Sequence, residues 1–174
     1  MEFDVFPQEG EEIERLKTRL DAWLESVPKW HAHFVWSPNE VPAWAEPVKP
    51  LSQSKVALVT SAGIYLTSQK PFDVESEYGD WSFREIPSNA NPDDLKISDT
   101  HYDHSEADLD INCLFPITHL LTLKSEGVIA EVASNHYGFM GYVPDPVHLV
   151  RDTAPEVAQR LLKDEVDIVF LTPG

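Results

Sequence analysis

One stretch of the sequence, residues 98–116, gathers most of the side chains that could do chemistry. Its possible ligands and proton carriers are Asp99, His101, Asp103, His104, Glu106, Asp108, Asp110 and Cys113, with no Lys or Arg among them. Apolar residues flank the stretch on both sides, so we predict a loop between two buried elements. Loops on a rigid scaffold often carry ligating and catalytic groups. A solvated acidic loop whose histidines cap nearby backbone is the alternative.

A metal is one use for these side chains. His101, Asp103 and His104 could hold a divalent transition metal such as zinc or iron, since neutral imidazoles and carboxylates are the ligands that these ions take. A bound metal would generate hydroxide near neutral pH. His136 could supply a third nitrogen. The sequence therefore leaves open a metal-dependent enzyme built on this loop.

Residues 95–107 also resemble the metal loop of the metallo-β-lactamase superfamily, a strand followed by H-x-H-x-D-H, with Asp99 in place of the first histidine. The fold argues against membership, because that superfamily needs a duplicated sheet and further ligands far downstream. Cys113 is the only cysteine. We expect it to be a small buried hydrophobe, as lone cysteines commonly are.

The elements that must position these residues follow from hydrophobic patterning. Residues 55–60 form a nearly continuous apolar run, which is typical of a strand covered on both faces. The small residues of 61–63 then suit close approach of backbone to a ligand. Further strands are predicted over 82–86, 128–132 and 167–171, the last fully buried. Residues 136–142 are predicted as an aromatic, glycine-rich loop.

Helices are predicted between these strands. One runs from Thr118 to Glu126 and is stopped by Gly127. Another begins at Asp152 or Thr153, with Pro155 in its first turn. This alternation predicts an α/β fold, a three-layer sandwich around a mainly parallel sheet. The loops after residues 60, 97, 132 and 171 should then meet at one edge of the sheet.

The N-terminal part has a different character. Residues 11–27 carry apolar side chains at helical spacing and predict an amphipathic helix. Residues 28–50 are rich in proline and tryptophan and predict an extended arm. With 174 residues, we expect a single α/β domain over 1–174, in which 1–50 form the helix and arm and 51–174 form the core.

Composition limits the partners. The formal net charge of −17 would repel nucleic acid and anionic membranes, so neither is expected as a partner. One cysteine excludes an internal disulfide framework. The acidic start has no signal-peptide pattern, and no apolar run approaches the length of a membrane span. We expect a cytoplasmic protein that forms a homo-oligomer.

Five motifs in order, residues 56–65, 79–86, 100–105, 110–117 and 136–141, are similar to the selenoprotein B family. That family contains the substrate-specific B components of glycine, sarcosine and betaine reductases and the small subunit of D-proline reductase. The resemblance implies an oxidoreductase that cleaves a C–N bond in a small amino-acid or amine substrate. It also implies a selenocysteine or cysteine nucleophile and a separate partner subunit that carries a pyruvoyl group.

Roles can be given to polar residues on this hypothesis. Arg84 would hold a substrate carboxylate, since its planar fork matches two oxygens; a salt bridge to a nearby acid is the alternative. Ser61 and Tyr65 would donate hydrogen bonds to the substrate. His101, His104 and His136 would transfer protons, because imidazole titrates near pH 7.

The sequence also departs from the family pattern. The family's selenocysteine motif, with a second thiol three residues on, follows a strand like residues 168–171, whereas this sequence stops at Gly174. A UGA codon read as stop, an artificially shortened chain, or a short homologue with different chemistry would each explain this. A non-catalytic accessory subunit is therefore a further alternative. We expect the terminus to point at the His101 loop.

Overall fold

The computed structural model describes residues 14, 18, 21, 22, 25, 45–100 and 102–174. The chain divides into two compact units, Met1–Ala43 and Trp44–Gly174. In the first unit all five described residues are helical, and the Thr18 hydroxyl donates to the Glu14 carbonyl at 2.8 Å. The rest of the helix predicted over 11–27, and the predicted arm as far as residue 44, lie outside the described residues. The expectation of a single domain stays a prediction.

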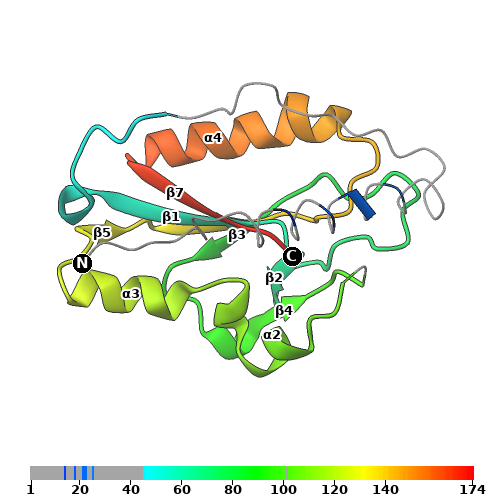
Figure 1. Ribbon diagram of the computed structural model, residues 1–174, viewed down its shortest axis with the longest axis horizontal. Helices are drawn as coiled ribbons and strands as arrows, with labels where there is room; N and C mark the ends of the chain where they lie inside the picture. Colours follow the sequence, from blue (N-terminus) through cyan, green and yellow to red (C-terminus); the bar gives the residue numbers. More distant parts are fainter. Residues whose placement is uncertain (1–13, 15–17, 19–20, 23–24, 26–44, 101) are drawn as a thin grey trace. The chain divides into compact units, whose positions relative to one another are not determined.

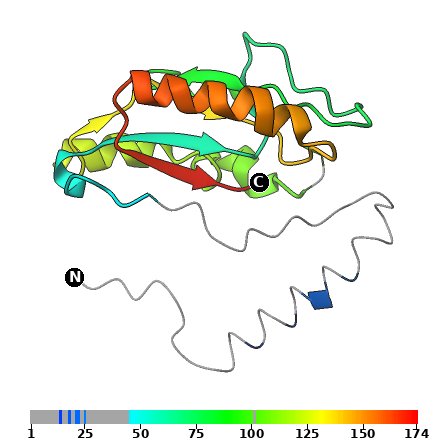
Figure 2. The ribbon, with the colours of Figure 1, turned by 90° about the horizontal axis from the view of Figure 1, so that it is seen from above.

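The second unit is built on a five-stranded sheet whose central strand is β1 (Lys55–Thr60). On one edge β1 pairs in parallel with β5 (Glu131–Val132) and then with β6 (Asn135–Gly138). On its other edge it pairs in parallel with β7 (Ile168–Thr172), and both are side by side in Figures 1 and 2. β3 (Arg84–Pro87) runs antiparallel to β6. The predicted α/β class with a mainly parallel sheet is confirmed.

Two longer helices pack on this sheet, drawn on opposite sides of it in Figure 1. α3 (Ile117–Ser125) buries Ile117 and Leu120, and Gly127 follows it with a φ of +71°, as expected for a helix stop. α4 (Ala154–Lys163) has a proline in its first turn, as predicted, and follows a π-helical turn, η4 (Leu149–Thr153). Side chains fully buried between the layers include Leu58, Ile64, Ile86 and Phe115.

A small second sheet stands beside the first. It pairs β2 (Ile64–Leu66) with β4 (Leu95–Ile97) in antiparallel fashion. Short 3-10 turns precede β1 and β4, namely η1 (Leu51–Gln53) and η2 (Pro92–Asp94). The acidic stretch after β4 is not the continuous loop that we predicted. It contains a short helix, α2 (Ser105–Leu109), and a 3-10 turn, η3 (Ile111–Cys113), because Asp103 and Asp110 accept hydrogen bonds from the backbone N–H groups of Ser105 and Asn112.

Several further predictions are wrong in detail. The loop predicted over 136–142 is wrong at its start, since β6 runs from Asn135 to Gly138; residues 139–142 lie outside the strands. The strand predicted over 128–132 is confined to Glu131–Val132. β7 lies where it was predicted but is not buried, since Phe170 is 52% and Leu171 70% exposed and the described elements cover its two faces only in part. Among the described residues β7 is also an edge strand. Cys113 is exposed rather than buried. In the described part of the chain, none of the helices has the length and apolar character needed to cross a bilayer.

Candidate functional site

The turn that leaves β1, residues 61–63, is where segments from distant parts of the chain meet. The Ser61 N–H donates to the Thr172 carbonyl of β7 at 3.0 Å, and the Gly63 N–H donates to the Phe139 carbonyl at 2.8 Å. The Ser98 N–H donates to the Gly63 carbonyl at 3.0 Å. The predicted meeting of the loops after residues 60, 97 and 171 is therefore confirmed. The fourth segment follows β6 and not residue 132, since the chain continues from β5 into β6.

Glycines allow this close packing. Gly63 has a φ of +69°, and a Cβ added there would lie 3.0 Å from the Asp99 backbone nitrogen and 3.1 Å from the Met140 sulfur. A Cβ added at Gly141 would lie 3.0 Å from the Ser61 carbonyl, 3.6 Å from Asp99 Oδ2 and 3.9 Å from Ser61 Oγ. The Asp99 carboxylate and the Ser61 hydroxyl therefore border the same small space at Gly141. Asp99 is only 2% exposed.

Tyr102 is hydrogen-bonded to the turn 61–63. Its hydroxyl donates to the Ala62 carbonyl at 2.9 Å. Burial, together with the negative charges of Asp99 and Asp108, raises the pKa of Tyr102 to about 12, so the phenol stays protonated and remains a donor. Gly174 packs here too, since a Cβ on it would lie 2.9 Å from Tyr102 Cε1 and 2.7 Å from Ala62 Cα. The expectation that the terminus points at the His101 loop is confirmed at Tyr102.

An apolar pocket opens beside the same turn. Its volume is about 560 Å³, and its walls come from the ends of β1 and β7, from the segment after β6, from η4 and from the start of α4. The lining residues are Val59, Thr60, Ser61, Phe139, Met140, Leu149, Val150, Ala154, Leu171, Thr172 and Pro173. We name the turn 61–63, Asp99, Tyr102 and this pocket the edge site. Its place at the carboxyl ends of parallel strands is where open α/β sheets bind ligands.

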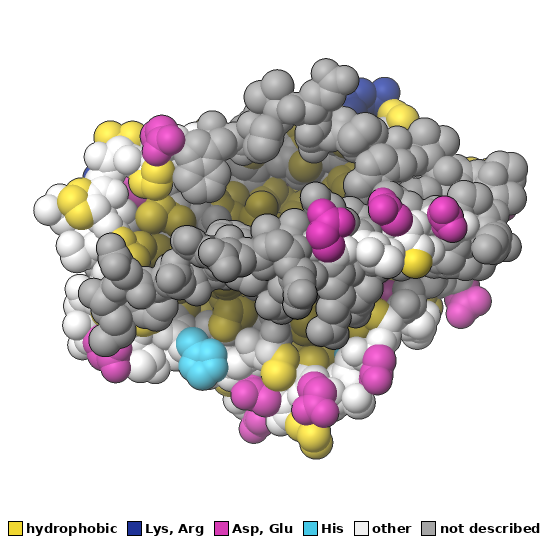
Figure 3. Space-filling view, viewed as in Figure 1, with side chains coloured by type: hydrophobic (Ala, Val, Ile, Leu, Met, Phe, Trp, Pro, Cys, Tyr) yellow, Lys and Arg dark blue, Asp and Glu magenta, His cyan; other side chains and the backbone are white. Residues whose placement is uncertain are grey.

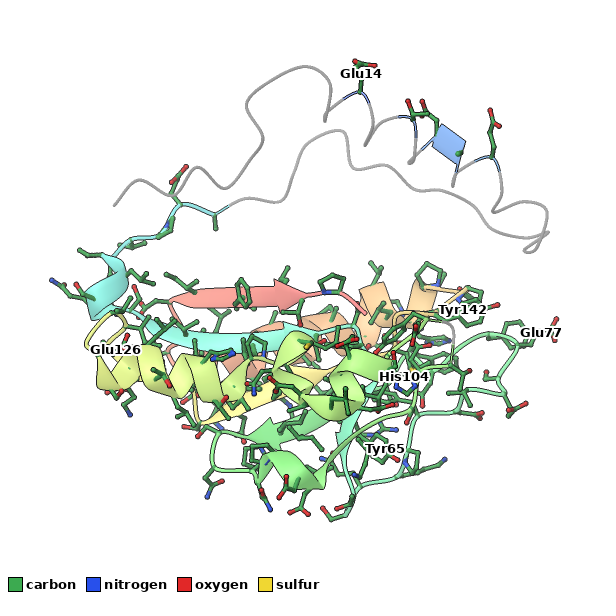
Figure 4. The ribbon with its side chains drawn as sticks, turned by 60° about the horizontal axis from the view of Figure 1, so that its bottom comes forward. Glu14, Tyr65, Glu77, His104, Glu126 and Tyr142 are labelled. Carbon is green, nitrogen blue, oxygen red and sulfur yellow. The ribbon has the colours of Figure 1, made fainter. Side chains whose placement is uncertain are left out.

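Of the residues predicted for substrate and proton transfer, Ser61 lies in the edge site and His104 lies close to it. His104 Nδ1 is 2.9 Å from Asp108 Oδ2, and its ring meets Tyr102 edge-on with centroids 5.8 Å apart. Tyr65 lies on β2 opposite Lys96. Figure 4 shows Tyr65 and His104 toward the same end of the unit, away from Glu126. His101 lies outside the described residues.

Arg84 is used by the protein's own loops. Its guanidinium donates to the carbonyls of Lys70 at 2.7 Å and Pro71 at 3.1 Å, and to the Ser82 hydroxyl at 2.8 Å. Nη2 also lies 3.6 Å from Asp80 Oδ2. These contacts tie residues 70–71 to residues 80–84, at a pocket separate from the edge site. The geometry therefore favours the salt-bridge alternative over a free substrate anchor.

His136 lies in the core and has no exposed surface. Its Nδ1 accepts the Leu58 N–H at 2.9 Å, so the neutral ring carries its proton on Nε2. Among the described residues Nε2 has no hydrogen-bond partner, and the ring meets Phe115 edge-on at 5.8 Å between centroids. Burial lowers the pKa of His136 to about 4, which the negative charge of Asp164 opposes only in part. At neutral pH this histidine is an uncharged part of the sheet.

Of the three predicted metal ligands, His101 lies outside the described residues, and Asp103 and His104 are described. Among residues 45–100 and 102–174, no group of three His, Cys, Asp or Glu side chains could hold an ion. Asp103 Oδ1 accepts the Ser105 N–H at 3.0 Å, and His104 is engaged by Asp108. In Figure 3, acidic side chains gather at the lower edge of the view, over α2. This matches the solvated acidic surface that was the alternative reading of the stretch.

Sequence reasoning counted Asp99 among the possible ligands but assigned no role to Tyr102. Both lie in the segment after β4 (Leu95–Ile97), and a strand end at the ligand edge of a sheet is the signal that points to such residues. The small residues at 61–63 were recognised, but the elements that would press against them were not. Such contacts join residues 40 positions apart, as between Ala62 and Tyr102.

Comparison with known proteins gives the family. The model of the family described as glycine/sarcosine/betaine reductase selenoprotein B matches residues 30–174, and the chain belongs to this family. It shares 41% identity over 133 residues with the D-proline reductase subunit gamma of Acetoanaerobium sticklandii. It shares 35% over 136 residues with a glycine reductase complex component B subunit gamma of Symbiobacterium thermophilum. A sarcosine reductase complex component B subunit beta of Peptoclostridium acidaminophilum is 30% identical over 129 residues.

These relatives are larger proteins. The alignments cover 76%, 72% and 72% of this chain, but 54%, 30% and 29% of the respective relatives. The chain therefore spans about half of the D-proline reductase subunit and less than a third of the other two. By their names, the relatives are components or subunits of multi-subunit reductases. No solved structure matches this chain.

Proposed function

We propose that this chain is a subunit of a reductase that cleaves a C–N bond in a small amino acid or amine. The observation that carries the proposal is the 41% identity to the D-proline reductase subunit gamma over 76% of the chain. The matches to glycine and sarcosine reductase components support the same reaction class. D-Proline is the first substrate to test.

The edge site is the place that we assign to the substrate. It combines the Ser61 hydroxyl, the nearby Asp99 carboxylate and an apolar pocket of about 560 Å³. The Ser61 hydroxyl suits a polar group of the substrate, since a hydroxyl can both donate and accept a hydrogen bond. The pocket suits the alkyl part of the same molecule.

Reductive cleavage consumes two electrons and two protons, and it replaces the C–N bond by one C–H and one N–H bond. The sequence offers one thiol, Cys113, which is exposed and lies in η3. A single thiol cannot form the internal disulfide that a two-electron dithiol donor leaves behind. We therefore assign the electrons to a partner subunit or an added dithiol, and the positioning of substrate to this chain.

Reconstitution tests the proposal. The chain is added to the D-proline reductase of Acetoanaerobium sticklandii prepared without its gamma subunit, with a dithiol and D-proline, glycine or sarcosine. We expect one amine to be consumed only when the chain is present, and more slowly with Ser61→Ala. The exposed Ser68→Ala is the matched control and should act as the wild type. The proposal would be contradicted if none of the three amines were consumed.

A further inference from the structure

β7 is an edge strand without the features that normally protect an edge. It pairs with β1 on one side, and within residues 45–100 and 102–174 its other side pairs with nothing. Exposed edges are usually blocked by Lys, Pro or a bulge. The strand reads Ile168-Val-Phe-Leu-Thr172 and has no such residue. Its free N–H and C=O groups are open to pairing with a further strand.

The side chains of β7 are also uncovered. Val169 is 38%, Phe170 52% and Leu171 70% exposed. Strands of a parallel sheet normally have both faces covered. β7 crosses the middle of the view in Figure 1. An apolar strand that exposes both faces and one edge is an incomplete part of a sheet.

The exposed surface is continuous with the edge site. Leu171 forms part of β7 and also lines the apolar pocket, together with Val150, which is 68% exposed. The carbonyl of Thr172, at the end of the strand, accepts the Ser61 N–H at 3.0 Å. A molecule that covers β7 therefore also reaches the mouth of the substrate pocket.

The net charge of the chain indicates what kind of molecule covers β7. The chain carries a formal net charge of −17. A second copy would bring an equal negative charge, and long-range repulsion opposes their association. A partner with basic residues at the rim of its contact surface gains from the same field. When a strand is added to a sheet, backbone pairing gives the affinity and the side chains give the specificity. The exposed side chains of β7 are apolar, so they favour an apolar strand from the partner.

We propose that the outer edge of β7 and the adjoining apolar pocket form the docking surface for the partner reductase subunit. The partner adds an apolar strand with basic flanks to β7 and places a side chain in the pocket beside Leu171. This inference rests on the proposed function, because it takes the partner to be the subunit that supplies the electrons. On this proposal both subunits form the substrate site: this chain provides the pocket, and the partner closes it.

Binding to a defined probe tests the surface. The probe is again the Acetoanaerobium sticklandii D-proline reductase prepared without its gamma subunit, and the readout is the dissociation constant. Phe170→Glu and Leu171→Asp should each weaken binding at least about tenfold, as for residues at the centre of an interface. The control is Leu109→Asp on α2, which changes a leucine that is 84% exposed and lies outside this surface.

Hydrogen exchange on the unaltered chain gives a second measurement that needs no folded variant. We expect the amides of residues 168–172 to exchange measurably faster than those of β1 in the free chain, and to slow on addition of the probe. Slow exchange of β7 in the free monomer would overturn the proposal, because the strand would already be covered. No binding of the probe, or equal binding of all variants, would overturn it too.

A dimer of the free chain that becomes monomeric with Phe170→Glu would replace the partner by a second copy, and would instead confirm the homo-oligomer expected from the sequence. The experiments distinguish an error in the docking-surface proposal from an error in the proposed function. Normal turnover with unchanged binding of Phe170→Glu removes the docking surface alone. Tight, β7-dependent binding without consumption of any amine removes the reductase assignment alone.

Discussion

His136 Nδ1 accepts the Leu58 N–H at 2.9 Å and so joins β6 to β1 through a side chain. Leu58 lies between the two places where β1 pairs on this edge, Val56 with Val132 and Val59 with Tyr137. The ladder is interrupted there, because the chain passes from β5 to β6 through residues 133 and 134. The imidazole supplies the acceptor that the interrupted backbone does not.

Stability should therefore fall as the solution becomes acidic. The folded-state pKa of His136 is about 4, below the unfolded value of 6.5, so the unfolded chain binds the proton first. Stability is fully present above about pH 6.5 and is lost as pH falls toward 4, by up to about 3 kcal/mol. Urea unfolding between pH 7.5 and 4 measures this. His136→Asn should flatten the pH dependence, whereas His119→Asn, at an exposed histidine, should leave it unchanged.

Removing the Tyr102 hydroxyl should loosen the edge site. Tyr102→Phe deletes the hydrogen bond to the Ala62 carbonyl and leaves that acceptor without its phenol donor, at a cost of about 1 kcal/mol. Faster hydrogen exchange in residues 61–63 should accompany this loss. Tyr65→Phe is the matched control, since within the described residues the Tyr65 hydroxyl has no hydrogen-bond partner. Equal effects of the two variants would show that the hydrogen bond from Tyr102 to the Ala62 carbonyl does not hold the turn.

Arg84→Lys separates a structural role from a substrate role. An ammonium cannot reproduce the fork that binds Lys70, Pro71 and Ser82, so we expect a loss of about 2 kcal/mol in unfolding free energy and faster proteolysis within residues 71–82. Arg151→Lys, at an exposed arginine paired with Asp152, should change neither. A raised KM with unaltered stability would instead identify Arg84 as the carboxylate anchor predicted from the sequence.

Metal content tests the His101 loop. Asp103 and His104 are already engaged with Ser105 and Asp108. We therefore expect zinc and iron well below one equivalent per chain in protein purified without chelator. Elemental analysis measures this directly. One equivalent of zinc or iron that disappears with His104→Ala would restore the metal-dependent hypothesis.

The sheet was predictable where a pattern is local. The apolar run of β1 and the glycine stop after α3 give the strand and the helix end without any distant contact. β6 was missed because its sequence contains Gly138, which looked like a loop residue. A Cβ at Gly138 would lie 2.2 Å from the Ile64 carbonyl, so glycine is needed there for close packing of two segments.

The site was predictable only in part, for the same physical reason. Ser61 follows a recognisable strand, so its position at the ligand edge could be inferred. Whether His136 is a proton carrier or a core acceptor depends on its distance to Leu58, 78 positions away. Whether β7 is central or at the edge depends on which strands pair with it. Neither fact is present in the local composition.

The position of β1 at the centre of the sheet also has a consequence for synthesis. β1 leaves the ribosome before any strand that pairs with it, and the backbone N–H of Lys55 is bound by Asp167, 112 positions further along the chain. At roughly 5–20 residues per second, β1 waits on the order of ten seconds for its last neighbour. During that interval the nascent chain presents an apolar strand with two open edges. We expect this segment to be the main binding site for chaperones while the chain is being made.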